Sequence, residues 1–197
     1  LILGSREKIA LNKGESQLEY SKEGDLTLNR EQTIPVEIKD EVPEMNTLVI
    51  PYGNRSVITL ADGSRVWLNA GSRLIYPSKF VDKTREVFLT GEAFFDVAKN
   101  EKQPFVVKTV DVKVQVIGTR FNISAYPEDY SVQAVVADGS VEIKKVSAGL
   151  FDKAVRIAPG QLGYFNKKTQ ETEISDVDID HYTLWTEGLF KFSNTDF

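Results

Sequence analysis

Apolar residues recur at every second position through most of this 197-residue chain. In the stretch "VKVQV", for example, three valines alternate with Lys113 and Gln115. A two-residue period places successive side chains on opposite faces of a half-buried strand. The pattern therefore predicts strands over residues 112–116, 121–125 and 141–143, and over 87–97 on either side of Gly91.

Turn signals separate these runs. Pairs typical of tight turns occur at Gly24-Asp25, Asp62-Gly63, Gly71-Ser72, Gly118-Thr119, Asp138-Gly139 and Pro159-Gly160. Strong helical patterns are missing, so the predicted fold class is all-β. The glycine turns recur about every 20 residues, which favours a twisted β-solenoid-like stack of short antiparallel strands. A two-sheet β-sandwich is the alternative.

Three segments are expected along the chain. Residues 1–45 form an amino-terminal strand segment and a linker, because "IKDEVPEMN" at 38–46 combines a charge run with a proline. Residues 46–180 form the central β domain. Residues 181–197 begin a new aromatic-rich pattern after the acidic run "EISDVDID", and we expect them to be the start of a truncated carboxyl-terminal domain.

Composition and charge exclude several functions. Hydrophobic residues make up 41% of the chain and charged residues 27%, as in ordinary globular domains. The net charge is -5 and no basic stripe is present, which argues against nucleic-acid binding. Cysteine is absent, so disulfides and thiolate chemistry are excluded. No apolar run approaches the roughly 18 residues of a membrane helix.

Candidate catalytic groups are few. His181 is the single histidine, so a triad or a multi-histidine metal site would depend on it alone. Glu92 and Asp96 would stand about 13 Å apart along one strand, farther than the roughly 5 to 9.5 Å of glycosidase carboxylates. The acidic run at 176–180 lacks the glycine and closing glutamate of an EF-hand. We therefore predict no enzyme activity, cofactor or metal from these groups.

Six aromatic side chains invite a second hypothesis. They are Trp67, Tyr76, Phe80, Phe88, Phe94 and Phe95. Large rings usually supply core area in thin β-proteins, and that interpretation is preferred. The alternative is a platform on which sugar rings stack, and it requires several of these rings to point outward on one face.

The ordered motifs resemble a known family. They read "ITLADGSRVWLNAGSRLIYPSKF", "REVFLTGEAFFDVAKNEKQPFVVKT", "VQVIGTRFNISAYPED", "VADGSVEI", "IAPGQL" and "WTEGLFKF". From about Asn46 to Phe192 the chain is similar to the periplasmic region of FecR-type anti-sigma factors in the form common among Bacteroidetes. Residues 46–180 would then be the FecR-type β domain.

The resemblance implies a place in a signalling relay. In that family a cytoplasmic segment holds an extracytoplasmic-function sigma factor, and one membrane helix leads to the periplasmic region. A carboxyl-terminal domain then receives the signalling domain of an outer-membrane TonB-dependent transducer. This sequence lacks the cytoplasmic segment, the helix and the receiving domain, so we expect the periplasmic relay module of an inner-membrane protein. A carbohydrate-binding or structural β-module is the alternative.

The resemblance also marks particular positions. Its signature residues are expected to be architectural, with tight reversals at the glycines of the hairpin-like "DGSRVWLN" and "SRLIYP" and with Val66, Leu68, Leu74 and Tyr76 in the core. The signature positions are Asp62, Gly63, Trp67, Asn69, Gly91, Glu92, Phe121, Asn122, Asp138, Gly139, Pro159 and Gly160.

One peptide bond is a candidate for self-cleavage. Some relatives cleave themselves at a Gly-Thr peptide, and the matching bond here is Gly118-Thr119. The threonine hydroxyl would attack the preceding carbonyl if the backbone is strained, and the resulting ester would hydrolyse. The alternative is a glycine bulge or bend that joins the strand at 112–117 to the strand at 121–125.

Overall fold

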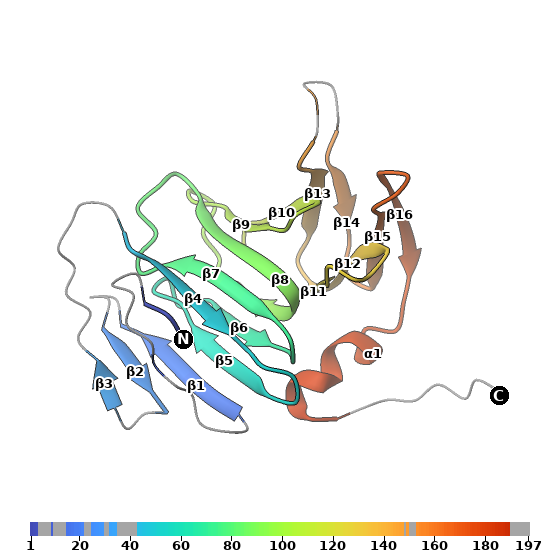
Figure 1. The fold of residues 1–197 in the computed structure, drawn as a ribbon. Helices are drawn as coiled ribbons and strands as arrows, with labels where there is room; N and C mark the ends of the chain where they lie inside the picture. The colour runs from blue at the N-terminus through green and yellow to red at the C-terminus, as the bar shows by residue number, and fades with distance from the viewer. Residues whose placement is uncertain are drawn as a thin grey trace.

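The computed structural model describes residues 1–3, 9, 15–21, 25–29, 32–34, 43–147, 149 and 153–189. Strands dominate these residues, and two short helical turns follow the last strand (Figure 1). The first strands are β1 (Glu15–Tyr20), β2 (Leu26–Leu28), β3 (Gln32–Ile34), β4 (Met45–Val49), β5 (Arg55–Thr59), β6 (Arg65–Leu68), β7 (Arg73–Pro77) and β8 (Arg85–Asp96). The others are β9 (Phe105–Lys108), β10 (Val112–Val116), β11 (Arg120–Ala125), β12 (Ser131–Asp138), β13 (Val141–Lys145), β14 (Val155–Ile157), β15 (Gln161–Asn166) and β16 (Glu171–Asp176). The turns are α1 (Asp180–Thr183) and the 3-10 helix η1 (Leu184–Glu187).

Strand β8 belongs to two sheets. Its first half pairs with β7 and in parallel with β9, within sheet A, whose order is β4-β7-β8-β9-β10-β13-β14. Its second half pairs with β6 and β11, within sheet B, whose order is β3-β2-β1-β5-β6-β8-β11-β12-β15-β16. Because β8 takes part in both sheets, backbone hydrogen bonds connect all of these strands into one β structure.

Gly91 lies where β8 passes from one sheet to the other. Its φ is +93°, a conformation that side-chain-bearing residues rarely adopt, and a Cβ at this position would lie 2.7 Å from the Cα of Ser72. The backbone around Ser72 is held close to the backbone of β8 by two hydrogen bonds. The Ser72 hydroxyl donates to the Glu92 carbonyl and accepts from the Glu92 amide, both at 2.9 Å. Glycine is therefore required here both by the positive φ and by the lack of space for a Cβ.

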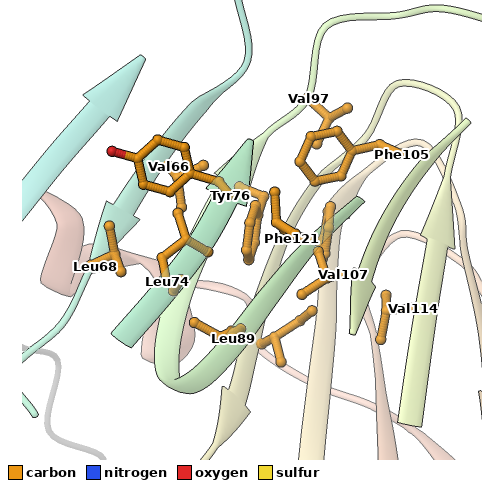
Figure 2. Packing of buried hydrophobic residues seen from close by; sticks show 14 of the residues in the cluster. Val66, Leu68, Leu74, Tyr76, Leu89, Val97, Phe105, Val107, Val114 and Phe121 are labelled. Atoms are coloured by element: carbon orange, nitrogen blue, oxygen red, sulfur yellow. The ribbon is translucent and has the colours of Figure 1, made fainter. Parts of the chain in front are cut away.

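The core lies between the two sheets (Figure 2). Phe95 and Phe121 of sheet B stack with ring centroids 5.1 Å apart, and Phe105 of sheet A meets Phe95 at 6.2 Å. At the other end Tyr20 of sheet B meets Tyr76 of sheet A edge to face at 5.7 Å. The expected core residues Val66, Leu68, Leu74 and Tyr76 are all fully buried, as predicted.

The all-β prediction is confirmed. The strand pairings branch at β8, and the two sheets that meet there face each other across the core, as in the sandwich alternative. The amino-terminal segment contributes to the same architecture, because β1 pairs in parallel with β5. The predicted linker lies largely outside the described residues, and β4 begins at Met45. Among the described helices none is long and apolar enough to span a membrane.

Candidate functional site: a polar network beneath the carboxyl-terminal helical turn

Three signature side chains converge on the outer face of sheet B. Glu92 stands on the second half of β8, Asn69 directly follows β6, and Asn122 stands on β11. The amide of Asn69 donates to Oε2 of Glu92 at 2.7 Å, and the amide of Asn122 donates to Oε1 at 2.9 Å. Both carboxylate oxygens are thus held by amides from the two neighbouring strands. Charge-assisted hydrogen bonds of this kind are stronger than neutral ones.

The network continues to the carboxyl-terminal helical segment. Arg55 of β5 donates from Nε to the side-chain oxygen of Asn69 at 3.4 Å and from Nη1 to the backbone carbonyl of Trp185 at 2.9 Å. Its guanidinium also lies 5.8 Å from the centroid of the Trp185 ring. A residue 130 positions away in sequence is therefore tied to the strands of sheet B (Figure 1).

Trp185 is the anchor of this segment. It is 7% exposed, whereas α1 contains no buried residue. Burying such a ring stabilises docking by about 3 kcal/mol. Among the described residues neither its Nε1 nor Oδ1 of Asn122 has a hydrogen-bond partner, although both atoms are buried, and a buried unpaired polar atom costs about 1–3 kcal/mol. The described contacts of this anchor with Arg55 are therefore one buried ring and one backbone carbonyl.

A second cluster surrounds Arg85, which is 1% exposed at the start of β8. Its Nη1 lies 2.6 Å from the Asp62 carboxylate and 2.8 Å from the Ala98 carbonyl. Its other nitrogens donate to the carbonyls of Gln103 at 2.8 Å and Ile117 at 3.2 Å. Asp62 in turn accepts from the amide and hydroxyl of Ser64, which fixes the Asp62-Gly63 turn. The ion pair therefore joins a signature turn to three separate backbone segments.

The self-cleavage candidate lies next to another signature turn. A Cβ on Gly139 would meet the Thr119 hydroxyl at 2.7 Å and the Gly118 carbonyl oxygen at 2.9 Å, so the Asp138-Gly139 turn packs directly on this bond. Thr119 is 3% exposed, and its hydroxyl donates to the Ser140 carbonyl at 3.0 Å. Gly118 lies in the bend between β10 and β11 with an unremarkable φ, and a Cβ there would meet Lys99 Cα at 2.6 Å. Close packing thus requires this glycine whether or not the bond is cleaved.

The other signature residues have structural positions. Phe121 lies in the core and stacks on Phe95. Gly160, with φ of +82°, follows Pro159 in the turn between β14 and β15, and its amide donates to the Val136 carbonyl at 2.9 Å. Trp67 contacts Phe94 across the strand pair β6–β8 at 5.6 Å.

The aromatic residues do not form a platform. Tyr76 and Phe95 are fully buried and Phe94 is 3% exposed. Phe88 is 42% exposed, but it lies on sheet A, whereas Trp67 lies on sheet B. The Trp67 ring is also covered by the Arg65 guanidinium at 4.6 Å. Phe80 is partly buried against the core and lines the same hollow as Phe88. Trp67, Tyr76, Phe88 and Phe94 therefore do not share the outward face that sugar stacking needs.

The remaining catalytic candidates have ordinary surroundings. His181 lies on α1, 3.8 Å from Asp178. Glu92 and Asp96 stand on one strand, with Glu92 engaged by two amides and Asp96 3.9 Å from Arg120. Among the described residues no group of three or more acidic or histidine side chains is arranged to hold a metal.

Sequence reasoning missed three residues of these clusters. Arg85 stands at an inward-facing position of the β8 alternation, and a charge at such a position was a usable signal. Trp185 opened the quoted motif "WTEGLFKF", but neither it nor Arg55 carried a signal of their contact, because that contact joins distant parts of the chain.

Comparisons with known proteins agree with this architecture. Residues 46–142 match the family model "FecR protein". Two crystal structures of a protein from Parabacteroides distasonis ATCC 8503, proposed to be an anti-sigma factor, superpose with TM-scores of 0.68 and 0.67 at 33% sequence identity. The similarity covers 73% of this chain and 65% of that one. No curated protein matches the sequence.

The β domain with its converging signature residues is a FecR-type domain. Over residues 46–142 the chain belongs to the FecR family.

Proposed function

We propose that this chain is the periplasmic signal-relay module of a transmembrane anti-sigma factor. It couples an outer-membrane TonB-dependent transducer to release of an extracytoplasmic-function sigma factor across the inner membrane. Family membership supports the anti-sigma role. The transducer, the sigma factor and the periplasmic location belong to the proposal.

The observation that carries the proposal is the contact between Arg55 and Trp185. Through Asn69 it connects the helical segment to Glu92, which lies at the centre of the signature motifs. A displacement of the helical segment would remove the ring and its carbonyl from this network. A transducer that binds the docked and undocked forms with different affinity would thereby change the populations of the two forms.

A small docking free energy suits this role. A ligand shifts a two-state equilibrium only by its differential affinity, and about 5.5 kcal/mol is needed to move it from 1:99 to 99:1. The anchor is one tryptophan whose Nε1 has no hydrogen-bond partner among the described residues, and we therefore place its docking free energy below that limit as part of the proposal. A partner of ordinary affinity can therefore release it.

The test uses the full-length protein in its own cells with a reporter for sigma-dependent transcription. We expect Arg55→Ala to alter reporter output in the presence or absence of the inducing nutrient. Arg73→Ala, which changes an exposed arginine on β7, serves as the matched control and leaves output unchanged. Normal protein levels with an unchanged response in the Arg55 variant would contradict the relay through this contact. An unchanged reporter after deletion of the gene would contradict the anti-sigma function itself.

A further inference from the structure

Three lysines form a row on the outer face of sheet A. Lys113 of β10 stands opposite Lys108 of β9 on one side and opposite Lys144 of β13 on the other. Like charges directly across a strand pair are destabilising. Lys108 pairs with Glu86, but neither Lys113 nor Lys144 forms an ion pair with a described residue, and both are exposed. The row is thus an unneutralised positive feature on a chain whose net charge is -5.

An apolar hollow continues the row. Phe88 of β8 stands opposite Lys108, whose ammonium lies 5.3 Å from the ring centroid. Phe88 is 42% exposed, and the hollow of about 410 Å³ beside it is also lined by Met45, at 45% exposure, and Val81, at 60%. A second hollow of about 290 Å³ is lined by the three lysines. The two hollows adjoin at Thr84 and Glu86, and together we call them the groove. Its second part is lined by Glu86 and Glu142 as well as by the three lysines.

We propose that this groove docks an acidic peptide segment of a partner protein. An apolar side chain of the segment fills the hollow beside Phe88, and its carboxylates lie on Lys113 and Lys144. The partner relieves the repulsion within the lysine row and covers the exposed rings and methyl groups at the same time. This proposal does not depend on the relay through Trp185, which lies against sheet B.

The arrangement of acids on the same face favours a peptide over an anionic membrane. Glu86 and Glu142 stand in the adjacent row of the sheet, beside Lys108 and Lys144 respectively. A uniformly anionic lipid surface would meet these carboxylates as well as the lysines. The charged side chains of a peptide lie at separate positions along its backbone. Its carboxylates can therefore contact the lysines without lying next to Glu86 and Glu142.

The experiment selects short random peptides displayed on phage against the purified chain. A parallel selection uses the double variant Lys113→Glu/Lys144→Glu. A matched control carries Lys102→Glu and Lys168→Glu, which change two exposed lysines elsewhere. Thermal unfolding verifies that all three proteins are folded. The lysine-row variant should be about as stable as the wild type, because it exchanges one like-charge contact between positions 113 and 144 for another and gains an opposite charge across from Lys108.

We expect peptides rich in Asp and Glu, with an aromatic or aliphatic residue, to be enriched on the wild type and on the control. A synthesised representative should bind the lysine-row variant about tenfold or more weakly, and Phe88→Ser should also weaken it. Absence of acidic enrichment, or binding unchanged by the lysine-row substitutions, would overturn the proposal. Salt-sensitive binding of the wild type to vesicles of phosphatidylglycerol and phosphatidylethanolamine, without peptide enrichment, would overturn it in favour of a membrane surface.

Discussion

Asn122 donates an amide hydrogen to Glu92 at 2.9 Å although the two residues are 30 positions apart. The same carboxylate accepts from Asn69, so both of its oxygens receive hydrogen bonds from amides. Two motifs that look independent in sequence are therefore parts of one contact. Two variants, one of Glu92 and one of Asn122, follow from this geometry.

Glu92→Gln should destabilise the domain by about 1–3 kcal/mol, because the new amide would face another amide and leave donors unpaired. Asn122→Asp should also be unfavourable, since two carboxylates would then be neighbours. Urea unfolding gives the free energies. A Trp67→Phe background leaves Trp185 as the single tryptophan, so its fluorescence also reports whether the helical segment loosens. Glu101→Gln on the exposed surface is the control. Stability equal to the wild type in the Glu92 variant would refute the role of the carboxylate as a hub.

The buried pair of Arg85 and Asp62 gives a second prediction. Asp62→Ala leaves the guanidinium with backbone carbonyls as its remaining partners, and we expect a loss of about 3 kcal/mol. Arg85→Met should cost a similar amount, because the Asp62 carboxylate loses its cationic partner and the Ala98 and Gln103 carbonyls lose this donor. The double variant should cost less than the sum of the two single variants, because each single change leaves a buried group without its partner.

Chemical denaturation of the wild type, the two single variants and the double variant gives the four free energies of a double-mutant cycle. The exposed pair of Lys99 and Glu101 is the comparison, and Glu101→Ala should change stability by less than about 0.5 kcal/mol. Additive effects of the Asp62 and Arg85 substitutions would show that the pair acts as two independent groups.

The Gly118-Thr119 bond remains a predicted cleavage site. Substitutions of Thr119 that keep its size but change its hydroxyl test this prediction. If the threonine hydroxyl is the nucleophile, Thr119→Val and Thr119→Ala should abolish a processed product in cells, whereas Thr119→Ser should retain it. Immunoblotting with mass spectrometry of both fragments locates the bond. The valine variant also fills the space of the methyl and hydroxyl groups, which separates loss of chemistry from loss of packing. A processed product that persists in the valine variant would exclude this nucleophile.

The tyrosine pair between the sheets predicts a pH effect. Burial raises the pKa of Tyr20 to about 12, and burial raises the pKa of Tyr76 well above its ordinary value of 10.0. Their hydroxyls lie 3.2 Å apart. The folded protein keeps both protons at pH values where the unfolded chain loses them, so stability is full below pH 10 and falls as the pH rises from 10 towards 12. For Tyr20 the loss is on the order of 2–3 kcal/mol.

Urea unfolding at a series of alkaline pH values measures this decline. The double variant Tyr20→Phe/Tyr76→Phe removes both hydroxyls together, so no buried partner is left unpaired, and its decline should be smaller. Tyr130→Phe, at a ring that is 88% exposed, should retain the slope of the wild type. Equal slopes in the wild type and the double variant would assign the alkaline sensitivity to other groups.

The sequence by itself determined the local features of this protein. The two-residue period identified the core-facing side chains of 112–116 and 121–125, because a pleated strand turns alternate residues to opposite faces. It did not predict the burial of Asn122 on the other face. Glycines at 63 and 139 marked turns with positive φ, since that conformation depends on the residue itself. The ordered motifs identified the family.

Only the tertiary structure decided which strands are neighbours. Alternation names the face of a residue but not its cross-strand partner, so it could not show that Glu92 lies between Asn69 and Asn122 or that three lysines form a row. The passage of β8 between two sheets and the docking of Trp185 on Arg55 depend on contacts between distant segments. Such contacts form because the packing of the whole chain favours one register over its alternatives, and no local pattern contains that information.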